Sequence, residues 1–206
     1  MPKVYLSPSQ QGANRCAAGD TERAHCNAVA DRLEAYLASC GVEVKRNRTL
    51  TALSDIAADS NAYGPDLHLA VHTNGSNGTV RGHHVYYYPT SEAGRRMARL
   101  LVERHAAIYQ APGAQNAAIG NSSYTELKRT RAVAVIEETV FHDNPDDAAW
   151  YHAHIEGVAR YLAEAVCAYF GVPFVEPTDW EAKYRAAEEE NAVLRARIAA
   201  ARAALG

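Results

Sequence analysis

Apolar residues recur along this chain with two different spacings, and the two alternate. Steps of three and four residues separate Cys26, Val29, Leu33 and Leu37, which predicts an amphipathic helix that starts near Glu22. Strict alternation predicts strands instead. Read this way, the chain has strands at 3–7, 42–46, 67–72, 83–88 and 132–137, and helices at 22–40, 51–62, 91–109 and 148–170.

This alternation of strands and helices predicts an α/β fold: a three-layer domain with a mostly parallel, twisted sheet flanked by helices. The segment 132–137 is apolar enough to be a central strand that is buried on both faces. In such sheets, ligands bind beyond the carboxyl ends of the strands. The residues that carry chemistry are therefore expected at those ends.

The chain divides into three parts. We predict a globular domain at 1–172, a linker at 173–179 that contains two prolines, and a coiled-coil helix at 180–206. Apolar residues in the last part follow a heptad pattern with one asparagine at an a position, which favours a homo-oligomer. The alternative is a helix that folds back onto its own domain. The heptad positions are a: Tyr184, Asn191, Ile198 and Leu205; and d: Trp180, Ala187, Leu194 and Ala201.

Charge and hydropathy exclude some classes of function. The net charge is −3, so the chain lacks the basic surface of a nucleic-acid-binding protein. No apolar run approaches the roughly 18 residues of a membrane span. The first residues do not resemble a signal peptide, which predicts synthesis in the cytoplasm.

Three acidic or histidine residues fall at the predicted sheet edge. Glu22 lies four residues before Cys26 and so on the apolar stripe of its helix. His72 ends a buried strand, and Glu138 follows the most apolar one. A carboxylate that faces inward is costly unless it is paired or bound to a metal. Two metal ligands and a spare glutamate fit a catalytic zinc site with a water beside a base.

Three segments resemble the zinc-dependent N-acetylmuramoyl-L-alanine amidases of type 3. They are GDTERAHCNAVADRLEAYLASCGVEVKRNR, DLHLAVHTNGS and AVAVIEETVFHDNPDDAAW, and the resemblance spans roughly residues 3 to 170. It implies that Glu22 and His72 bind Zn²⁺, that Glu138 is the catalytic base, and that Asn74 lies beside the site.

One departure concerns the third metal ligand. Where the family has a histidine after its first strand, this chain has Gln10 in LSPSQQG. The amide oxygen of Gln10 is a weaker donor for zinc than imidazole. Three explanations stay open: Gln10 is the ligand, His84 or His142 replaces it, or the metal binds weakly. The two histidines are also predicted to contact the substrate or its developing negative charge.

The resemblance implies a peptidoglycan hydrolase that cuts the amide between N-acetylmuramic acid and L-alanine. The SPSxQ and FHDN forms are similar to a subgroup of phage and clostridial lysins. We therefore expect a phage or prophage endolysin, which waits in the cytoplasm and reaches the wall after holin-dependent release. A bacterial or spore-related amidase is the other placement. A non-catalytic peptidoglycan-binding or assembly protein on the same scaffold is the alternative of a different class.

Overall fold

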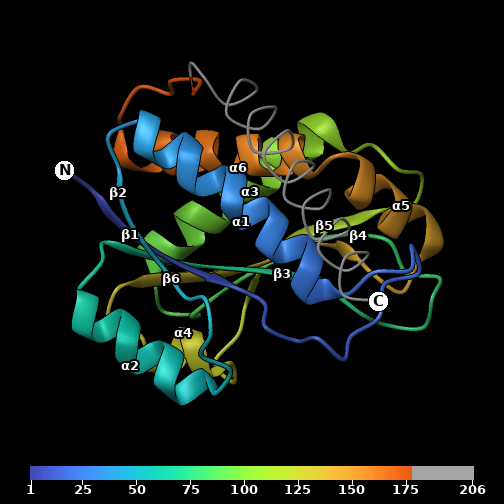
Figure 1. Ribbon diagram of the computed structural model, residues 1–206, viewed down its shortest axis with the longest axis horizontal. Helices are drawn as coiled ribbons and strands as arrows, with labels where there is room; N and C mark the ends of the chain where they lie inside the picture. Colours follow the sequence, from blue (N-terminus) through green and yellow to red (C-terminus); the bar gives the residue numbers. More distant parts are fainter. Residues whose placement is uncertain (178–206) are drawn as a thin grey trace, which may run out of the picture. The chain divides into compact units, whose positions relative to one another are not determined.

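One mixed sheet forms the frame of the domain. In the computed structural model, which describes residues 1–177, six strands lie in the order β2-β1-β3-β6-β4-β5 (Figure 1). Neighbouring strands are parallel except β4 and β6, which run antiparallel. The predicted α/β fold with a mostly parallel sheet is therefore confirmed, and the sheet contains one antiparallel pair. The strands are β1 (Lys3–Pro8), β2 (Glu43–Arg46), β3 (Leu67–Asn74), β4 (Gly82–Tyr87), β5 (Gln115–Gly120) and β6 (Val133–Phe141).

Helices cover both faces of the sheet, as Figure 1 shows. Three of them pack together against one face: α1 (Glu22–Ser39), α3 (Glu92–Ile108) and α6 (Ile155–Phe170). Two shorter ones, α2 (Leu53–Tyr63) and α4 (Thr125–Arg129), pack together on the other face, and α5 (Pro145–Ala153) follows β6. Within residues 1–177 no helix is both long and apolar enough to cross a membrane. The predicted coiled coil at 180–206 lies outside the described residues.

The register of the strands separates two kinds of surface. Leu6, Leu69, Val135 and Tyr87 form one row across four strands, and all belong to the main core under α1, α3 and α6. The residues next to them, preceding on the antiparallel β4 and following on the other strands, form the next row on the opposite face, because side chains alternate along a strand. This second row contains Ser7, Ala70, Ile136 and Tyr86, and its apolar members form a smaller core beside α4.

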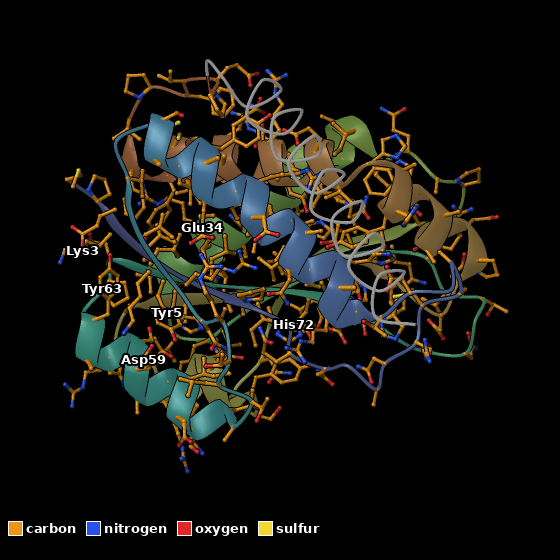
Figure 2. The ribbon with its side chains drawn as sticks, viewed as in Figure 1. Lys3, Tyr5, Glu34, Asp59, Tyr63 and His72 are labelled. Atoms are coloured by element: carbon orange, nitrogen blue, oxygen red, sulfur yellow. The ribbon has the colours of Figure 1, made fainter. Side chains whose placement is uncertain are left out.

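Helix α2 is attached to its face of the sheet by partly buried polar contacts. The Tyr5 hydroxyl on β1 donates a 2.8 Å hydrogen bond to Asp59 on α2 (Figure 2). Lys45 on β2 lies 2.6 Å from the same carboxylate. These contacts fix the position of α2 next to the carboxyl end of β1, where the candidate residues lie.

The sequence pattern misses two elements, β5 and α4, and joins α5 and α6 into one helix. The edge strand β5 is polar and largely exposed, so it has no apolar alternation to detect. Helix α4 has only five residues and is too short to show a helical period. The single helix predicted at 148–170 is wrong, because the chain breaks at His154 between α5 and α6. The His154 imidazole lies 2.7 Å from the Trp150 carbonyl oxygen and competes for a backbone acceptor of the helix.

A buried carboxylate joins the segments that carry the site. Asp147, which is 0% exposed, accepts hydrogen bonds from the backbone N–H groups of Gly82 and Phe141, at 3.2 and 3.1 Å. It also pairs with the Arg81 guanidinium at 2.8 Å and accepts a hydrogen bond from the Tyr109 hydroxyl. The start of β4, the end of β6 and the first turn of α5 therefore share one anchor.

We expect Asp147→Ala to lower the free energy of unfolding by about 3–5 kcal/mol, because it leaves the buried Gly82 and Phe141 amides and the Tyr109 hydroxyl without an acceptor and removes the buried partner of Arg81. Asp146→Ala is the matched control: the Asp146 side chain is 75% exposed and binds the same arginine, so its loss should cost at most about 1 kcal/mol. Urea unfolding of both variants measures the difference. Equal losses would contradict the anchoring role of Asp147.

Candidate active site

The register of three neighbouring strands places three candidate side chains in one row. His72 on β3 is the partner of Glu138 on β6, and Glu138 is in turn the partner of His84 on β4. Paired residues project to the same face of a sheet. The row therefore lies on the face that α2 and α4 cover, two residues beyond Ala70 and Ile136 towards the carboxyl end of β3.

Glu22 reaches this row from the first turn of α1. The Thr21 side chain caps the helix by accepting a hydrogen bond from the Ala24 amide at 3.2 Å. The Glu22 carboxylate, 1% exposed, then lies 2.9 Å from His72 Nδ1. Asn14 Nδ2 donates to its other oxygen at 2.6 Å. The predicted pair of Glu22 and His72 is thus in direct contact.

This contact is an ion pair that is largely buried from solvent. Burial acts to raise the pKa of Glu22, but hydrogen bonds from His72, Asn14 and Ser9 bring it below the usual 4.5. Burial acts to lower the pKa of His72, but the Glu22 hydrogen bond and the Glu138 and Glu22 charges raise it to about 9. A metal ion that binds both groups must displace the proton between them.

Glu138 is the carboxylate of the row, and within residues 1–177 one of its oxygens lacks a hydrogen-bond partner. Its Oε2 atom is buried and has no hydrogen-bond partner among the described residues. Burial raises the pKa of Glu138 to about 8, although the nearby His72 acts to lower it. An unpartnered buried carboxyl in a site is typical of a group that exchanges protons during a reaction.

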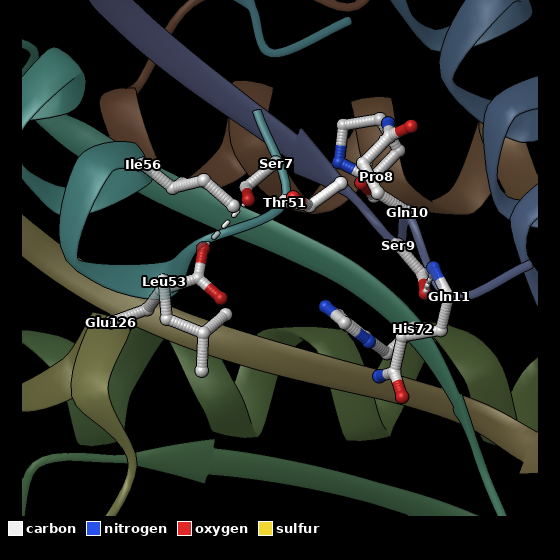
Figure 3. Close-up of a pocket in the computed structure, with 10 residues that line it drawn as sticks. All are labelled: Ser7, Pro8, Ser9, Gln10, Gln11, Thr51, Leu53, Ile56, His72 and Glu126. Atoms are coloured by element: carbon white, nitrogen blue, oxygen red, sulfur yellow. Dashed lines mark hydrogen bonds between the residues drawn. The ribbon is translucent and has the colours of Figure 1, made fainter. Parts of the chain in front are cut away.

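The two glutamines after β1 have different orientations. Gln10 Nε2 lies 3.3 Å from the Pro8 carbonyl oxygen, and Figure 3 shows its amide directed away from His72. Gln11 is directed towards His72 in the same view, and its Oε1 accepts a 3.0 Å hydrogen bond from Asn14, which also binds Glu22. In this conformation Gln11 is connected to the Glu22–His72 pair, and Gln10 would have to rotate to reach it.

The remaining predicted residues surround the row. Asn74 Nδ2 lies 3.3 Å from His84 Nδ1, so these two side chains meet beside Glu138. His142 is turned to the end of β3, where its Nδ1 lies 3.0 Å from Thr73 Oγ1 and 3.1 Å from the Thr73 carbonyl oxygen. The structure therefore brings Asn74 and His84 together, whereas His142 supports the strand end.

Several residues at the site carry no signal in the sequence pattern. Asn14 and Gln11 lie in a polar loop, where neither spacing nor residue type singles them out. Asp143 could have been found from the FHDN segment: its Oδ2 accepts hydrogen bonds from the Ser76 and Gly78 amides, at 2.9 and 2.8 Å, and so shapes the loop after β3.

The donors at the site suit a catalytic zinc in part. Glu22 and His72 supply a carboxylate and an imidazole, two of the three protein ligands that such sites use. Within residues 1–177 no group of three or more His, Cys, Asp or Glu side chains is arranged to hold a metal ion. An amide oxygen from Gln10 or Gln11, or an imidazole from His84 or His142, would have to complete the set.

A model of the N-acetylmuramoyl-L-alanine amidase family matches residues 4–168. The chain belongs to this family. It is an N-acetylmuramoyl-L-alanine amidase and acts on peptidoglycan, and the family as a whole is zinc-dependent. A comparison with curated proteins finds no match.

Solved structures of other amidases share the fold. The catalytic domain of CwlV from Bacillus (Paenibacillus) polymyxa var. colistinus is 19% identical, with a TM-score of 0.73 over 84% of this chain and 100% of its own. Ami1 from Mycobacterium smegmatis is 20% identical, with a TM-score of 0.70 over 82% and 97%. The catalytic domain of an endolysin targeting Clostridia difficile is 22% identical, with a TM-score of 0.68 over 82% and 98%. At these identities the likeness shows the fold alone.

We expect His72→Ala and Glu22→Gln to weaken zinc binding by more than the roughly 10- to 100-fold that loss of an outer partner costs this kind of site. Asn14→Ala, which removes such an outer partner of Glu22, should fall within that range. His152→Ala, on the exposed side of α5, is the control that should bind zinc like the parent protein. Competition with a chromophoric chelator measures all four affinities.

The same titration decides the third ligand. Loss of zinc in Gln10→Ala alone would support the position that the family resemblance implies, and loss in Gln11→Ala alone would move the role to its neighbour. Unchanged affinity in both would leave His84 or His142. If His72→Ala bound zinc as tightly as His152→Ala, the metal site would lie elsewhere.

Proposed function

We propose that Glu138 is the general base of this amidase and that Glu22 and His72 hold the catalytic zinc. The substrate bond is the amide between the lactyl group of N-acetylmuramic acid and L-alanine. The observation that carries the proposal is the buried, unpartnered Oε2 of Glu138 in register with His72, which itself touches Glu22.

Each group then has a defined task. Zinc, when bound, polarises the scissile carbonyl and makes the attacking water more acidic. Glu138 accepts the proton of that water and delivers it to the leaving amine of L-alanine. Its buried position suits this exchange, because no hydrogen bond from the described residues holds its Oε2 in one protonation state.

Asn74 and His84 are proposed to orient the substrate carbonyl. Asn74 follows His72 on β3, and its Nδ2 lies 3.3 Å from Nδ1 of His84, which is on the far side of Glu138, so a carbonyl between the row and solvent would face both. Donors placed where negative charge develops are the usual way to stabilise such a reaction. His142 is also predicted to contact the substrate. Because its ring is hydrogen-bonded to Thr73, we propose that it acts on the substrate indirectly, by positioning Thr73.

We also propose an endolysin origin for the chain, made in the cytoplasm and released to the wall. The SPSxQ and FHDN segments support this placement. The heptad pattern at 180–206 supports oligomerisation, which would multiply contacts with the wall. A non-catalytic peptidoglycan-binding role has one observation in its favour: Gln10, at the position where the family has a histidine, is turned towards Pro8.

Glu138→Gln should reduce kcat by about 100- to 10,000-fold, the usual contribution of a general base, and should keep the zinc affinity of the parent. Glu137→Gln is the matched control, because the neighbouring carboxylate projects to the opposite face and should leave turnover close to that of the parent. Release of L-alanyl peptides from a soluble muramoyl peptide measures both, with a chelator-treated sample as the baseline. Full activity in Glu138→Gln would remove it from the mechanism. A parent protein with zinc bound and no turnover would favour the non-catalytic role.

Deletion of residues 176–206 should weaken lysis of whole cells more than cleavage of a small soluble substrate, because only the wall offers several binding points at once. Ile198→Lys keeps the length of the segment and puts a charge at an a position, so it should reproduce the deletion. Turbidity loss of a cell-wall suspension and hydrolysis of the soluble substrate are compared in parallel. Equal losses in the two assays would argue against avidity.

A further inference from the structure

A pocket of about 350 Å³ lies next to His72, and its use is not explained by the residues of the proposed mechanism. It is formed by the end of β1 with the loop after it, by the start of α2 and by α4 (Figure 3). The apolar part of its wall consists of Pro8, Leu53 and Ile56. Its other lining residues are Ser7, Ser9, Gln10, Gln11, Thr51, His72 and Glu126.

Glu126 is a buried carboxylate in the wall of this pocket, and one of its oxygens is fully engaged. The residue is 3% exposed. Its Oε1 accepts a 2.6 Å hydrogen bond from the Ser7 hydroxyl and lies 3.0 Å from His68 Nε2. His68 is itself held by Ser60 at 3.0 Å and by the stacked Tyr5 ring. The carboxylate is therefore fixed in orientation from behind.

The second oxygen of Glu126 is available to a ligand. Within residues 1–177 no hydrogen bond reaches Oε2, and Figure 3 shows this oxygen directed into the pocket. His68 and His72 lie near this carboxylate, but neither hydrogen-bonds Oε2. None of the lining residues is a lysine or an arginine, so Oε2 is free to accept a hydrogen bond from a cationic group that enters the pocket.

The chemistry of the pocket indicates what that partner is. Apolar walls suit a short aliphatic chain, and a fixed carboxylate oxygen suits an ammonium group at the end of it. A stem peptide whose diamino acid is lysine carries a side chain of this form. His72 lines the same pocket, so a peptide bound at the reacting centre could extend towards Glu126.

We propose that this pocket is a specificity subsite for the side-chain amine of the stem-peptide diamino acid, with Glu126 as the acceptor of that amine. The inference rests on the proposed function, because it assumes a muramoyl peptide at Glu138. It adds a specificity-determining residue that belongs neither to the row of His72, Glu138 and His84 nor to the Glu22–His72 pair.

The test uses two ligands that differ in one group. They are muramoyl-L-alanyl-γ-D-glutamyl-L-lysine and the same compound with its lysine amine acetylated. The parent protein should prefer the free amine by about 10- to 100-fold in Kd and in kcat/KM, the range expected for one hydrogen bond to a charged group. Acetylation should act on KM rather than kcat, because the amine is remote from the scissile bond.

Glu126→Gln should abolish this preference by weakening binding of the free amine alone, while binding of the acetylated compound stays the same. Ser7→Ala is the matched control: it removes a hydrogen bond to the same carboxylate but keeps the charge, so the preference should persist. Circular dichroism verifies that both variants fold.

Equal affinity of the parent protein for the two compounds would overturn the subsite, whatever the variants do. Calorimetry on the Glu138→Gln variant measures the two affinities without turnover, which separates the two proposals. Amine-selective binding with no cleavage would support the subsite and contradict the proposed function. Cleavage of both compounds at equal kcat/KM would support the proposed function and contradict the subsite.

Discussion

The site depends on the register of β6 between its two neighbours. Glu137 and Glu138 are consecutive, so they project to opposite faces, and a slip of one residue would exchange them. Glu137 is surrounded by partners: hydrogen bonds from Tyr161 and from Thr139 at 2.7 Å, with His83 at 3.0 Å. Glu138 has a buried oxygen without any partner among the described residues. Two residues of one type thus differ in role because the strand register gives them different surroundings.

That register is supported by buried groups away from the chemistry. Asp147 binds backbone amides at the start of β4 and at the end of β6, the two strands that carry His84 and Glu138. Close packing on β4 adds to this constraint, because a side chain at Gly82 would come within 2.2 Å of the Gln115 carbonyl oxygen on β5. The antiparallel pair β4–β6, which the sequence does not reveal, therefore positions two of the three residues in the row.

The sequence predicted what periodicity and strand ends can reveal, and missed what loops determine. The main strands and helices were found because one face of each is apolar. Glu22, His72 and Glu138 were singled out because they stand at the ends of such elements, and the structure places them together. Asn14, Gln11 and Glu126 could not be found in this way, since a polar loop and a five-residue helix have no period. Their positions depend on contacts with residues distant in the sequence, such as Ser7 with Glu126.

Strand β3 carries two imidazole–carboxylate pairs on one face, and burial separates their functions. His68 with Glu126 is closed: the His68 ring is 0% exposed, and Ser60 and Glu126 engage its two nitrogens. His72 with Glu22 is more open, with 13% of the His72 side chain exposed, and it lines the pocket. The enclosed His68 ring can only orient Glu126, whose second oxygen faces the pocket, whereas His72 at the pocket surface can exchange its proton for a metal ion. The inner pair therefore fixes the pocket wall, and the outer pair is where we place the chemistry.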